Sequence, residues 1–523
     1  MLSRPSAGST AASALLNARN SFICTRCLNH RRAASSSTAV RNNGPVPTLP
    51  RPLSSRPSFS AHATRRPVIR AFATTSPART SHDDNDANHK PKHNTSALTP
   101  LPHRRLLALS GPDAPKFLQG LTTNNVRGTE TDGWYTAFLN AQGRVLYDAF
   151  VYPTPHAAGA AAGGKATRDG DRDGDGGRGR ATGGDDWACF VEVDGACVDA
   201  LHRALRRHKL RSKIRLRVVE EREWGVWAGW VVEGEEGGEK QQQQQRQGRS
   251  ESPSLAQAMM QRRAVHLVDG RVPGFGGHRF LVPGGAGVAD VAGYLPPAFA
   301  ALERATPRDY RVRRYLHGLA EGPEEIRVEE ALPLESNVDL MRGVDFRKGC
   351  YIGQELTIRT KHTGVVRKRI LPVRLYDGEE EPERLEFVEG GAGVRAEDLP
   401  PGVVDVKKIA DGPSAADAPP ARKRKDGRSA AKWLAGVGNV GLALCRLEMM
   451  TDVKVAAEGM GPASGGYQPG MRFGLRWEVP GEEGEKGVGV KAFVPEWHRL
   501  RAEEEAKSKK KKIVQKEFEL DDE

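Results

Sequence analysis

Two spacings of hydrophobic residues alternate along this chain, one typical of strands and the other typical of helices. Residues 104–126, RRLLALSGPDAPKFLQGLTTNNV, predict a strand, a Gly-Pro-Asp turn, and a helix that begins at Asp113 with Pro115 in its first turn. Residues 133–152, GWYTAFLNAQGRVLYDAFVY, are two apolar runs joined by NAQGR, which predicts a hairpin. The chain therefore mixes strands with helices.

The same mixture continues towards the C-terminus. Residues 187–219 predict a strand, an amphipathic helix with Val198, Leu201 and Leu205 on one face, and a second strand. Later apolar runs are shorter and are separated by turns, as expected of a small β domain. The GVGNVG stretch at 436–441 follows the polar KRKDGRSAAKW and precedes a strand-like run, so it is expected to be a hairpin turn and not a dinucleotide-binding loop.

Three segments interrupt these patterns and have too few apolar residues to offset the entropy of ordering. They are rich in Gly and charged residues, in Gln, or in Pro, Gly, Glu and Lys. We expect disordered inserts at about 156–186, 233–262 and 377–432. The last residues, 503–523, are expected to be a solvated charged tail.

The net charge of +13 is concentrated at the N-terminus. Residues 1–81 contain twelve Arg, no Lys and no acid, and the first acid is Asp83, so about +1 remains for the rest of the chain. This remainder does not favour nucleic-acid binding. An Arg-, Ser- and Ala-rich, acid-free N-terminus is typical of a mitochondrial presequence, expected here over residues 1–72 with Arg70 just before a cut after Phe72. A disordered basic arm is the alternative.

Six cysteines are present, too few and too scattered for a disulfide framework, which fits the reducing mitochondrial matrix. Cys24 and Cys27 lie in the expected presequence and have no second pair to complete a metal site. No apolar run reaches the roughly 18 residues that a membrane span requires. We therefore expect a mature matrix protein without a membrane span.

Cys350 differs from the other cysteines because of its neighbours in the KGCYIGQELTIRT stretch, residues 348–360. Arg347 and Lys348 precede it, and Arg359 and Lys361 follow it. The GQEL sequence resembles a helix start, with Gly353 at the cap and Glu355 in the first turn. Cations and a helix N-terminus both favour a thiolate, and two glycines allow a tight turn around it. No histidine lies close enough in sequence to indicate a Cys-His nucleophile, so ligation of iron or transfer of sulfide stays open.

The sequence KGCYIGQE, with Arg359 after it, resembles the signature of the YgfZ branch of the superfamily that includes the aminomethyltransferase of glycine cleavage. Further stretches resemble this family, and together they cover roughly residues 98–370: GPDAPKFLQGLTTNNV, NAQGRVLYD, LRRHKLRSKI, GHRFLVP, YRVRRYLHGLAEG and LPLESNVDL. The resemblance implies an α+β, aminomethyltransferase-like fold, with antiparallel sheets, helices and a small C-terminal β-barrel. The expected organisation is a linker at 73–97, a folate-binding-like region at 98–370 and a barrel domain at 371–502.

The resemblance also implies a function. The protein is expected to be an iron-sulfur cluster assembly factor of the mitochondrial matrix that acts late, with A-type scaffold proteins as partners and four-iron apo-enzymes such as aconitase and lipoate synthase as clients. Cys350 would contact a transient, shared cluster. The remaining motif residues would shape its loop: Lys348, Gly349, Tyr351, Gly353, Gln354, Glu355 and Arg359. Tetrahydrofolate is the second expected cofactor, in a cavity with Asn140, Asp148 and Glu335 among its lining residues.

The rival interpretation is the folate-dependent aminomethyltransferase itself. That enzyme has two adjacent acids after a Gly-Gly in its hairpin, whereas this chain has Tyr147 before Asp148. Asn125 also occupies a position where an acid is common in the enzyme. A positioned carboxylate is needed for its proton chemistry. The pattern therefore favours the assembly factor, and a purely structural protein with an incidental thiol is the third alternative.

Overall fold

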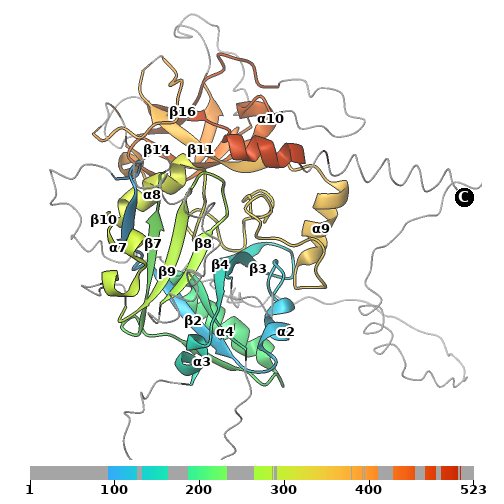
Figure 1. Ribbon diagram of the computed structural model, residues 1–523. Coiled ribbons are helices and arrows are strands. Elements are labelled where there is room, and N and C mark those ends of the chain that lie inside the picture. Colours follow the sequence, from blue (N-terminus) through green and yellow to red (C-terminus); the bar gives the residue numbers. More distant parts are fainter. Residues whose placement is uncertain are drawn as a thin grey trace, which may run out of the picture. The chain divides into compact units, whose positions relative to one another are not determined.

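The computed structural model describes residues 92–126, 132–162, 187–232, 264–285, 287, 291–378, 380–390, 393, 395–409, 428–453, 466–478, 485–504 and 507 (Figure 1). The expected presequence, the insert expected at 233–262 and most of the insert expected at 156–186 lie outside these residues, whereas more than half of the insert expected at 377–432 is described. So do Cys24, Cys27 and nearly all of the charged tail.

Two five-stranded sheets form the first part of the described chain. One has the order β10-β1-β7-β9-β8 and the other has the order β3-β4-β5-β2-β6. All neighbouring strands are antiparallel except β1 and β10, which form a short parallel pair. The strands are β1 Ala97–Pro100, β2 Arg104–Ser110, β3 Trp134–Leu139, β4 Val145–Pro153, β5 Ala188–Asp194, β6 Arg215–Val218, β7 Trp224–Trp230, β8 Val265–Asp269, β9 Gly277–Pro283 and β10 Glu303–Arg304.

Some of the helices cover the outer faces of these sheets. Residues of α2 and α4 pack on the β3-β4-β5-β2-β6 sheet, and residues of η1 and α7 pack on the other sheet (Figure 1). The two sheets share one apolar core between their inner faces. The helices of this part are α2 Ala114–Gln119, α3 His156–Ala161, α4 Gly195–Lys209, η1 Val291–Tyr294, α7 Pro297–Ala300, α8 Pro307–Leu316 and α9 Gln354–Thr363.

A closed barrel follows, with the strand order β11-β14-β13-β12-β15-β16. Its core consists of inward-facing aliphatic and aromatic side chains, among them Val373, Leu475 and Val490. Its strands are β11 Lys368–Tyr376, β12 Asp405–Lys408, β13 Ala431–Val437, β14 Val440–Arg446, β15 Phe473–Glu478 and β16 Glu485–Ala492, and its short helices are η2 Ala396–Asp398 and α10 Leu447–Met450. A last helix over residues 496–504 bonds back to the two-sheet part, where the Trp497 indole donates to the carbonyl of His317 at 2.9 Å.

The structure confirms the predicted α+β class with antiparallel sheets and a C-terminal barrel. The NAQGR stretch joins β3 to β4, and GVGNVG is the turn between β13 and β14, with Gly438 at a positive φ of 54°. The predicted bounds of two disordered inserts include ordered elements, because α3 lies within 156–186 and β12 lies within 377–432. β12 is a charged strand with one buried side chain, Val406, so its sequence has no apolar run.

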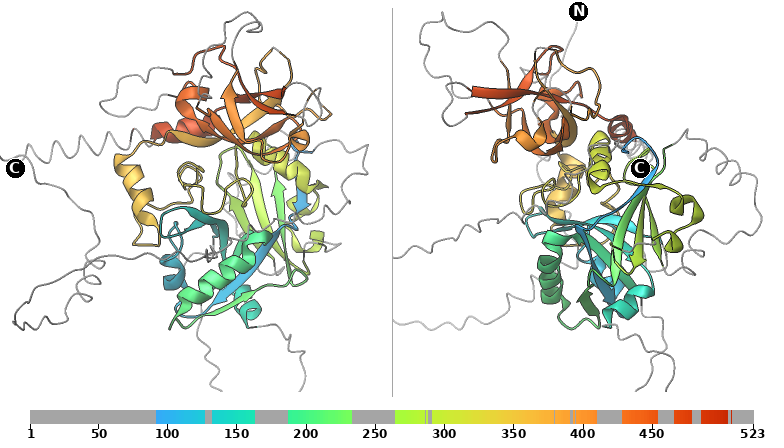
Figure 2. Two further views of the ribbon diagram at one scale, coloured as in Figure 1. Left: turned by 180° about the vertical axis from the view of Figure 1, so that it is seen from behind. Right: turned by 90° about the vertical axis from the view of Figure 1, so that its left-hand side faces the viewer.

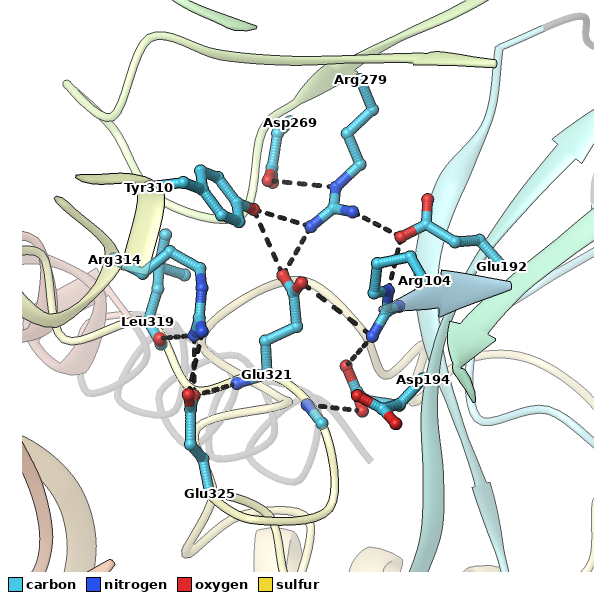
Figure 3. Close-up of polar contacts among 12 residues, drawn as sticks. Arg104, Glu192, Asp194, Asp269, Arg279, Tyr310, Arg314, Leu319, Glu321 and Glu325 are labelled. Atoms are coloured by element: carbon cyan, nitrogen blue, oxygen red, sulfur yellow. Dashed lines mark hydrogen bonds and ion pairs between the residues drawn. The ribbon is translucent and has the colours of Figure 1, made fainter. Parts of the chain in front are cut away.

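A buried ionic network connects the two sheets (Figure 3). Arg104 on β2 donates to Glu192 on β5 at 2.7 Å, and Arg279 on β9 donates to the same Glu192 carboxylate. Glu321, which follows α8, accepts from Arg279 and lies 3.0 Å from Arg271. All five side chains are at most 5% exposed.

The charges of this network compensate one another. Burial alone would raise the pKa of Glu321, but Arg279, Arg104 and Arg271 outweigh it and hold that pKa well below its ordinary value. The carboxylate therefore stays ionised in the core. A buried ion that loses its partner is costly, so the network depends on each of its members.

No helix in the part of the chain described here is long and apolar enough to cross a membrane.

We predict that Arg279→Met lowers the free energy of unfolding by about 3 to 5 kcal/mol, because it leaves the Glu192 and Glu321 carboxylates buried with one cation fewer. Urea unfolding measures this change. Arg222→Met is the matched control, since the Arg222 pair with Glu220 is exposed and its loss changes stability little. Equal stability of Arg279→Met and the parent protein would contradict this interpretation of the network.

Candidate functional site

The candidate site is the loop that precedes α9. Cys350 is exposed at its centre, four positions before the first residue of the helix. The other cysteines that the structure describes, Cys189, Cys197 and Cys445, are buried, and burial raises the pKa of each of these thiols. Cys350 is therefore the accessible thiol of the described chain.

Lys348 fastens the loop to the end of α2. Its ammonium group donates to the backbone carbonyls of Gln119, Thr122 and Asn124 at 2.5 to 2.9 Å. Burial lowers the pKa of Lys348 to about 8, so the side chain is still cationic at neutral pH. A lysine has three donors, and these three carbonyls use all of them. Lys348 is thus an anchor of the loop.

Tyr351 holds the loop from the other side of the cysteine. Its ring is buried in the core between the sheets, and the Lys348 ammonium lies 4.9 Å from the ring centroid. Burial raises the pKa of its hydroxyl group. The next residue, Ile352, donates its backbone N–H to the carbonyl of Gly120 at 3.1 Å. Lys348 and Tyr351 therefore both point inwards, while the thiol of Cys350 between them stays at the surface.

Gly353 packs directly against the NAQGR hairpin. It has a φ of 78°, and a Cβ atom there would lie 2.2 Å from the carbonyl oxygen of Asn140. Gly143 of the hairpin also approaches closely, because its Cβ would lie 2.9 Å from the carbonyl oxygen of Gly353. Gly349 differs, since its φ is not in the left-handed region and a Cβ there would meet nothing within 4 Å. Only the second glycine of the motif is required by geometry.

The remaining motif residues belong to the start of α9. Gly353 is the N-cap residue, as predicted, and Glu355 lies in the first turn. The Gln354 side-chain oxygen accepts from the backbone N–H of Tyr351 at 3.3 Å, which closes the turn. Glu355 and Arg359 are exposed on the helix surface. The motif thus divides into residues that hold the loop and residues that face outwards.

The cations predicted to surround the thiol are arranged differently. Lys348 bonds to the end of α2, and the Lys361 ammonium lies 4.8 Å from the ring centroid of Phe346. The sequence did not reveal the partner of Lys348, because Gln119–Asn124 lies more than 220 residues away along the chain. The only signal was that GLTTNN and KGCYIGQE both belong to family-like stretches.

The three residues expected in a folate cavity each have other partners in the structure. Asn140 closes the hairpin, where its side-chain oxygen accepts from the backbone N–H groups of Gln142 and Arg144, both at 3.0 Å. Asp148 is buried, and it accepts from the backbone N–H of Gly322 at 3.0 Å. Burial, opposed by Arg104, raises the pKa of Asp148.

Glu335 lines a groove that the NAQGR hairpin and the barrel also border, and its carboxylate is 3.6 Å from the ammonium of Lys368. A folate site lined by Asn140, Asp148 and Glu335 therefore stays a prediction, and no step is derived through folate. Buried and bonded, Asp148 also does not offer the accessible carboxylate that aminomethyl transfer requires.

No group of three or more His, Cys, Asp or Glu side chains arranged to hold a metal ion occurs among the described residues. Cys350 thus offers a metal a single ligand from this part of the chain. The arrangement is an exposed thiol on a loop that is fastened at both sides.

The fold and the site define a class: a two-sheet α+β protein with a closed C-terminal barrel and one presented cysteine. Residues 367–500 match the family model described as "CAF17, C-terminal beta-barrel domain". Among solved structures, the aminomethyltransferase T of the glycine cleavage system of Bartonella henselae is similar over 77% of this chain and 87% of its own, with 11% identity and a TM-score of 0.46.

Curated relatives identify the family. A protein of Aspergillus fumigatus named "Iron-sulfur cluster assembly factor IBA57 homolog, mitochondrial" is 40% identical over 464 residues, which is 86% of this chain and 91% of the relative. Relatives with the same name from Pyricularia oryzae and Neurospora crassa are 40% and 37% identical, over 77% of this chain in each case and 85% and 81% of the relative. The chain belongs to the IBA57 family of mitochondrial iron-sulfur cluster assembly factors. The relatives' names confirm the predicted mitochondrial location.

We predict that Gly353→Ala lowers the free energy of unfolding by more than about 2 kcal/mol, because a side chain is strained at a positive φ and its Cβ would collide with Asn140. Gly349→Ala is the matched control and changes stability by less than about 0.5 kcal/mol. Thermal unfolding of the two variants measures both effects. Similar losses in the two would show that the loop is not built as described.

Proposed function

We propose that the protein assists iron-sulfur cluster assembly in the mitochondrial matrix by lending Cys350 as one ligand to a cluster that it shares with a partner protein. The supporting observation is the position of this thiol. It is exposed, whereas the other cysteines of the described chain are buried with raised pKa values. Cysteine thiolates are the usual ligands of iron-sulfur clusters.

A shared cluster follows from the number of ligands. A two-iron or four-iron cluster takes four protein ligands, and Cys350 supplies one of them. We propose that an A-type scaffold protein supplies the others, and that the recipients are four-iron enzymes such as aconitase and lipoate synthase. The partners and recipients come from the family resemblance, while the single ligand comes from the geometry of the loop.

The anchoring of the loop suits this role. Lys348, Tyr351 and Gly353 hold the backbone on both sides of Cys350, so little conformational entropy is lost when the thiol binds a metal on a partner. A preorganised ligand also keeps its direction, which a shared cluster needs because its other ligands belong to another chain. The loop therefore holds the Cys350 sulfur atom in a fixed position and direction.

We predict that Cys350→Ser folds normally but fails to restore aconitase activity and protein lipoylation in cells that lack this protein. The serine hydroxyl is a poor ligand for iron-sulfur clusters, and the exposed position tolerates the change. Cys197→Ala, in which a buried thiol at the start of α4 is removed, is the control and should restore both activities. Full rescue by Cys350→Ser would remove the proposed role of the thiol.

Binding of tetrahydrofolate stays a prediction from the family resemblance. Calorimetric titration of the purified protein with tetrahydrofolate tests it, with weak binding as the expected result. The absence of both a heat signal and a shift of the unfolding temperature at saturating tetrahydrofolate would rule the cofactor out.

A further inference from the structure

A cluster of basic side chains surrounds the end of α4. We call it the cationic patch, and its members come from α2, from the last turn of α4 and from the loop that follows: Lys116, Arg206, Arg207, Lys209, Arg211 and Lys213. Five of the six are exposed, and Lys209 is half-buried. None of the six forms an ion pair with another residue of the described chain. Their charge is therefore available to a binding partner.

Leu210 projects from the middle of the patch. Its side chain is 87% exposed, the largest exposure among the large hydrophobic residues that the structure describes. It caps α4 with a φ of 43°, a conformation that favours glycine and is strained for leucine. Leu210 also borders a surface hollow together with Phe117 and Arg211. An exposed, strained leucine contributes nothing to the folded core, which points to a contact outside the chain.

The patch lies next to the cysteine loop. Both are attached to α2, whose six residues span about 9 Å by the rise of a helix. At the start of α2, the Asp113 carboxylate accepts from the backbone N–H of Lys213. At its end, the Gln119 carbonyl accepts from the Lys348 ammonium. Figures 1 and 2 show α2 beside α4 and below α9. A partner of ordinary size that covers the patch therefore also reaches Cys350.

We propose that the cationic patch docks the acidic surface of the protein that shares the cluster, with Leu210 inserted into an apolar pocket of that partner. This inference rests on the proposed function, and it adds the position and chemistry of the docking surface. Unpaired cations steer an acidic partner during approach and raise the association rate, whereas a central apolar side chain in a pocket slows dissociation. The two parts of the surface thus have separable kinetic effects.

Other anionic ligands fit the patch less well. Surfaces that bind single-stranded nucleic acid combine cations with exposed aromatic rings for base stacking, and the aromatic ring at this surface, Phe117, is 9% exposed. An anionic membrane would use the same cations with one apolar anchor. Membrane binding, however, would not explain why the patch and the loop that carries the exposed thiol are attached to the same short helix, α2. A protein partner accounts for both, so membrane binding becomes an outcome of the test.

The test compares variants of the full-length protein for binding to a purified A-type scaffold protein by stopped-flow kinetics. Arg207→Glu with Arg211→Glu should lower the association rate at least tenfold at low salt, and the difference should shrink at high salt because ions screen the charges. The matched control is Arg311→Glu with Lys408→Glu, which makes the same charge change at two exposed sites outside the patch and should have much less effect.

Leu210→Gly tests the apolar contact. It should raise the dissociation rate about tenfold, as expected for loss of a central apolar anchor. It should not lower the unfolding temperature, because glycine tolerates the positive φ that strains leucine. A purely structural Leu210 would give the opposite combination, namely a less stable protein with unchanged binding, and would overturn the proposal.

Two further results would also overturn it. One is scaffold binding that is unaffected by the Arg207 and Arg211 changes. The other is patch-dependent binding to phosphatidylcholine vesicles that contain cardiolipin, without patch-dependent binding to the scaffold. Cys350→Ser separates this proposal from the proposed function, because it should dock with unchanged rates and yet form no cluster. Docking without any cluster in the parent mixture would contradict the shared ligand and leave the docking surface standing.

Discussion

The presentation of Cys350 depends on one contact, the ammonium of Lys348 within a ring of three backbone carbonyls at the end of α2. The Gln119 carbonyl ends the helix and lacks a partner within it, so it is a natural acceptor for a cation, and the carbonyls of Thr122 and Asn124 follow in the next turn of the chain. This contact fixes the residue two positions before the thiol. The close packing of Gly353 on Asn140 fixes the residue three positions after it. Because the chain is held at both of these positions, Cys350 between them stays exposed at the surface.

The loop is stiff because the structure below it is stiff. The hairpin that receives Gly353 and the strands beside α2 belong to one sheet, and the ionic network ties that sheet to the other one. Buried charges of this kind specify how two surfaces fit together, because any other arrangement leaves an ion unpaired. The barrel and the final helix complete the fold, since Trp497 and Arg501 bond to carbonyls of the two-sheet part.

Local features of the fold could be predicted from the sequence. The hairpin at NAQGR, the helix entered at Asp113 and the cap at Gly353 each depend on a few neighbouring residues, and each appears in the structure. The motif pointed to the cysteine that is exposed in the structure. The positions of the motif's cationic side chains could not be predicted. Lys348, for example, bonds to backbone carbonyl groups that are distant in sequence, and a backbone group leaves no signal in the sequence. The ionic network was also missed, although an acid alone among apolar residues, as Glu192 is in FVEVD, was a signal of a buried ion pair.

The most direct measurement of the central claim is anaerobic reconstitution of the purified protein with an A-type scaffold protein, followed by Mössbauer and visible circular dichroism spectroscopy. The account predicts a cluster spectrum for the mixture that differs from that of the scaffold alone, and that reverts to the scaffold spectrum when Cys350 is replaced by serine. An identical spectrum with and without the Cys350 sulfur would contradict the claim that this protein shares a cluster ligand.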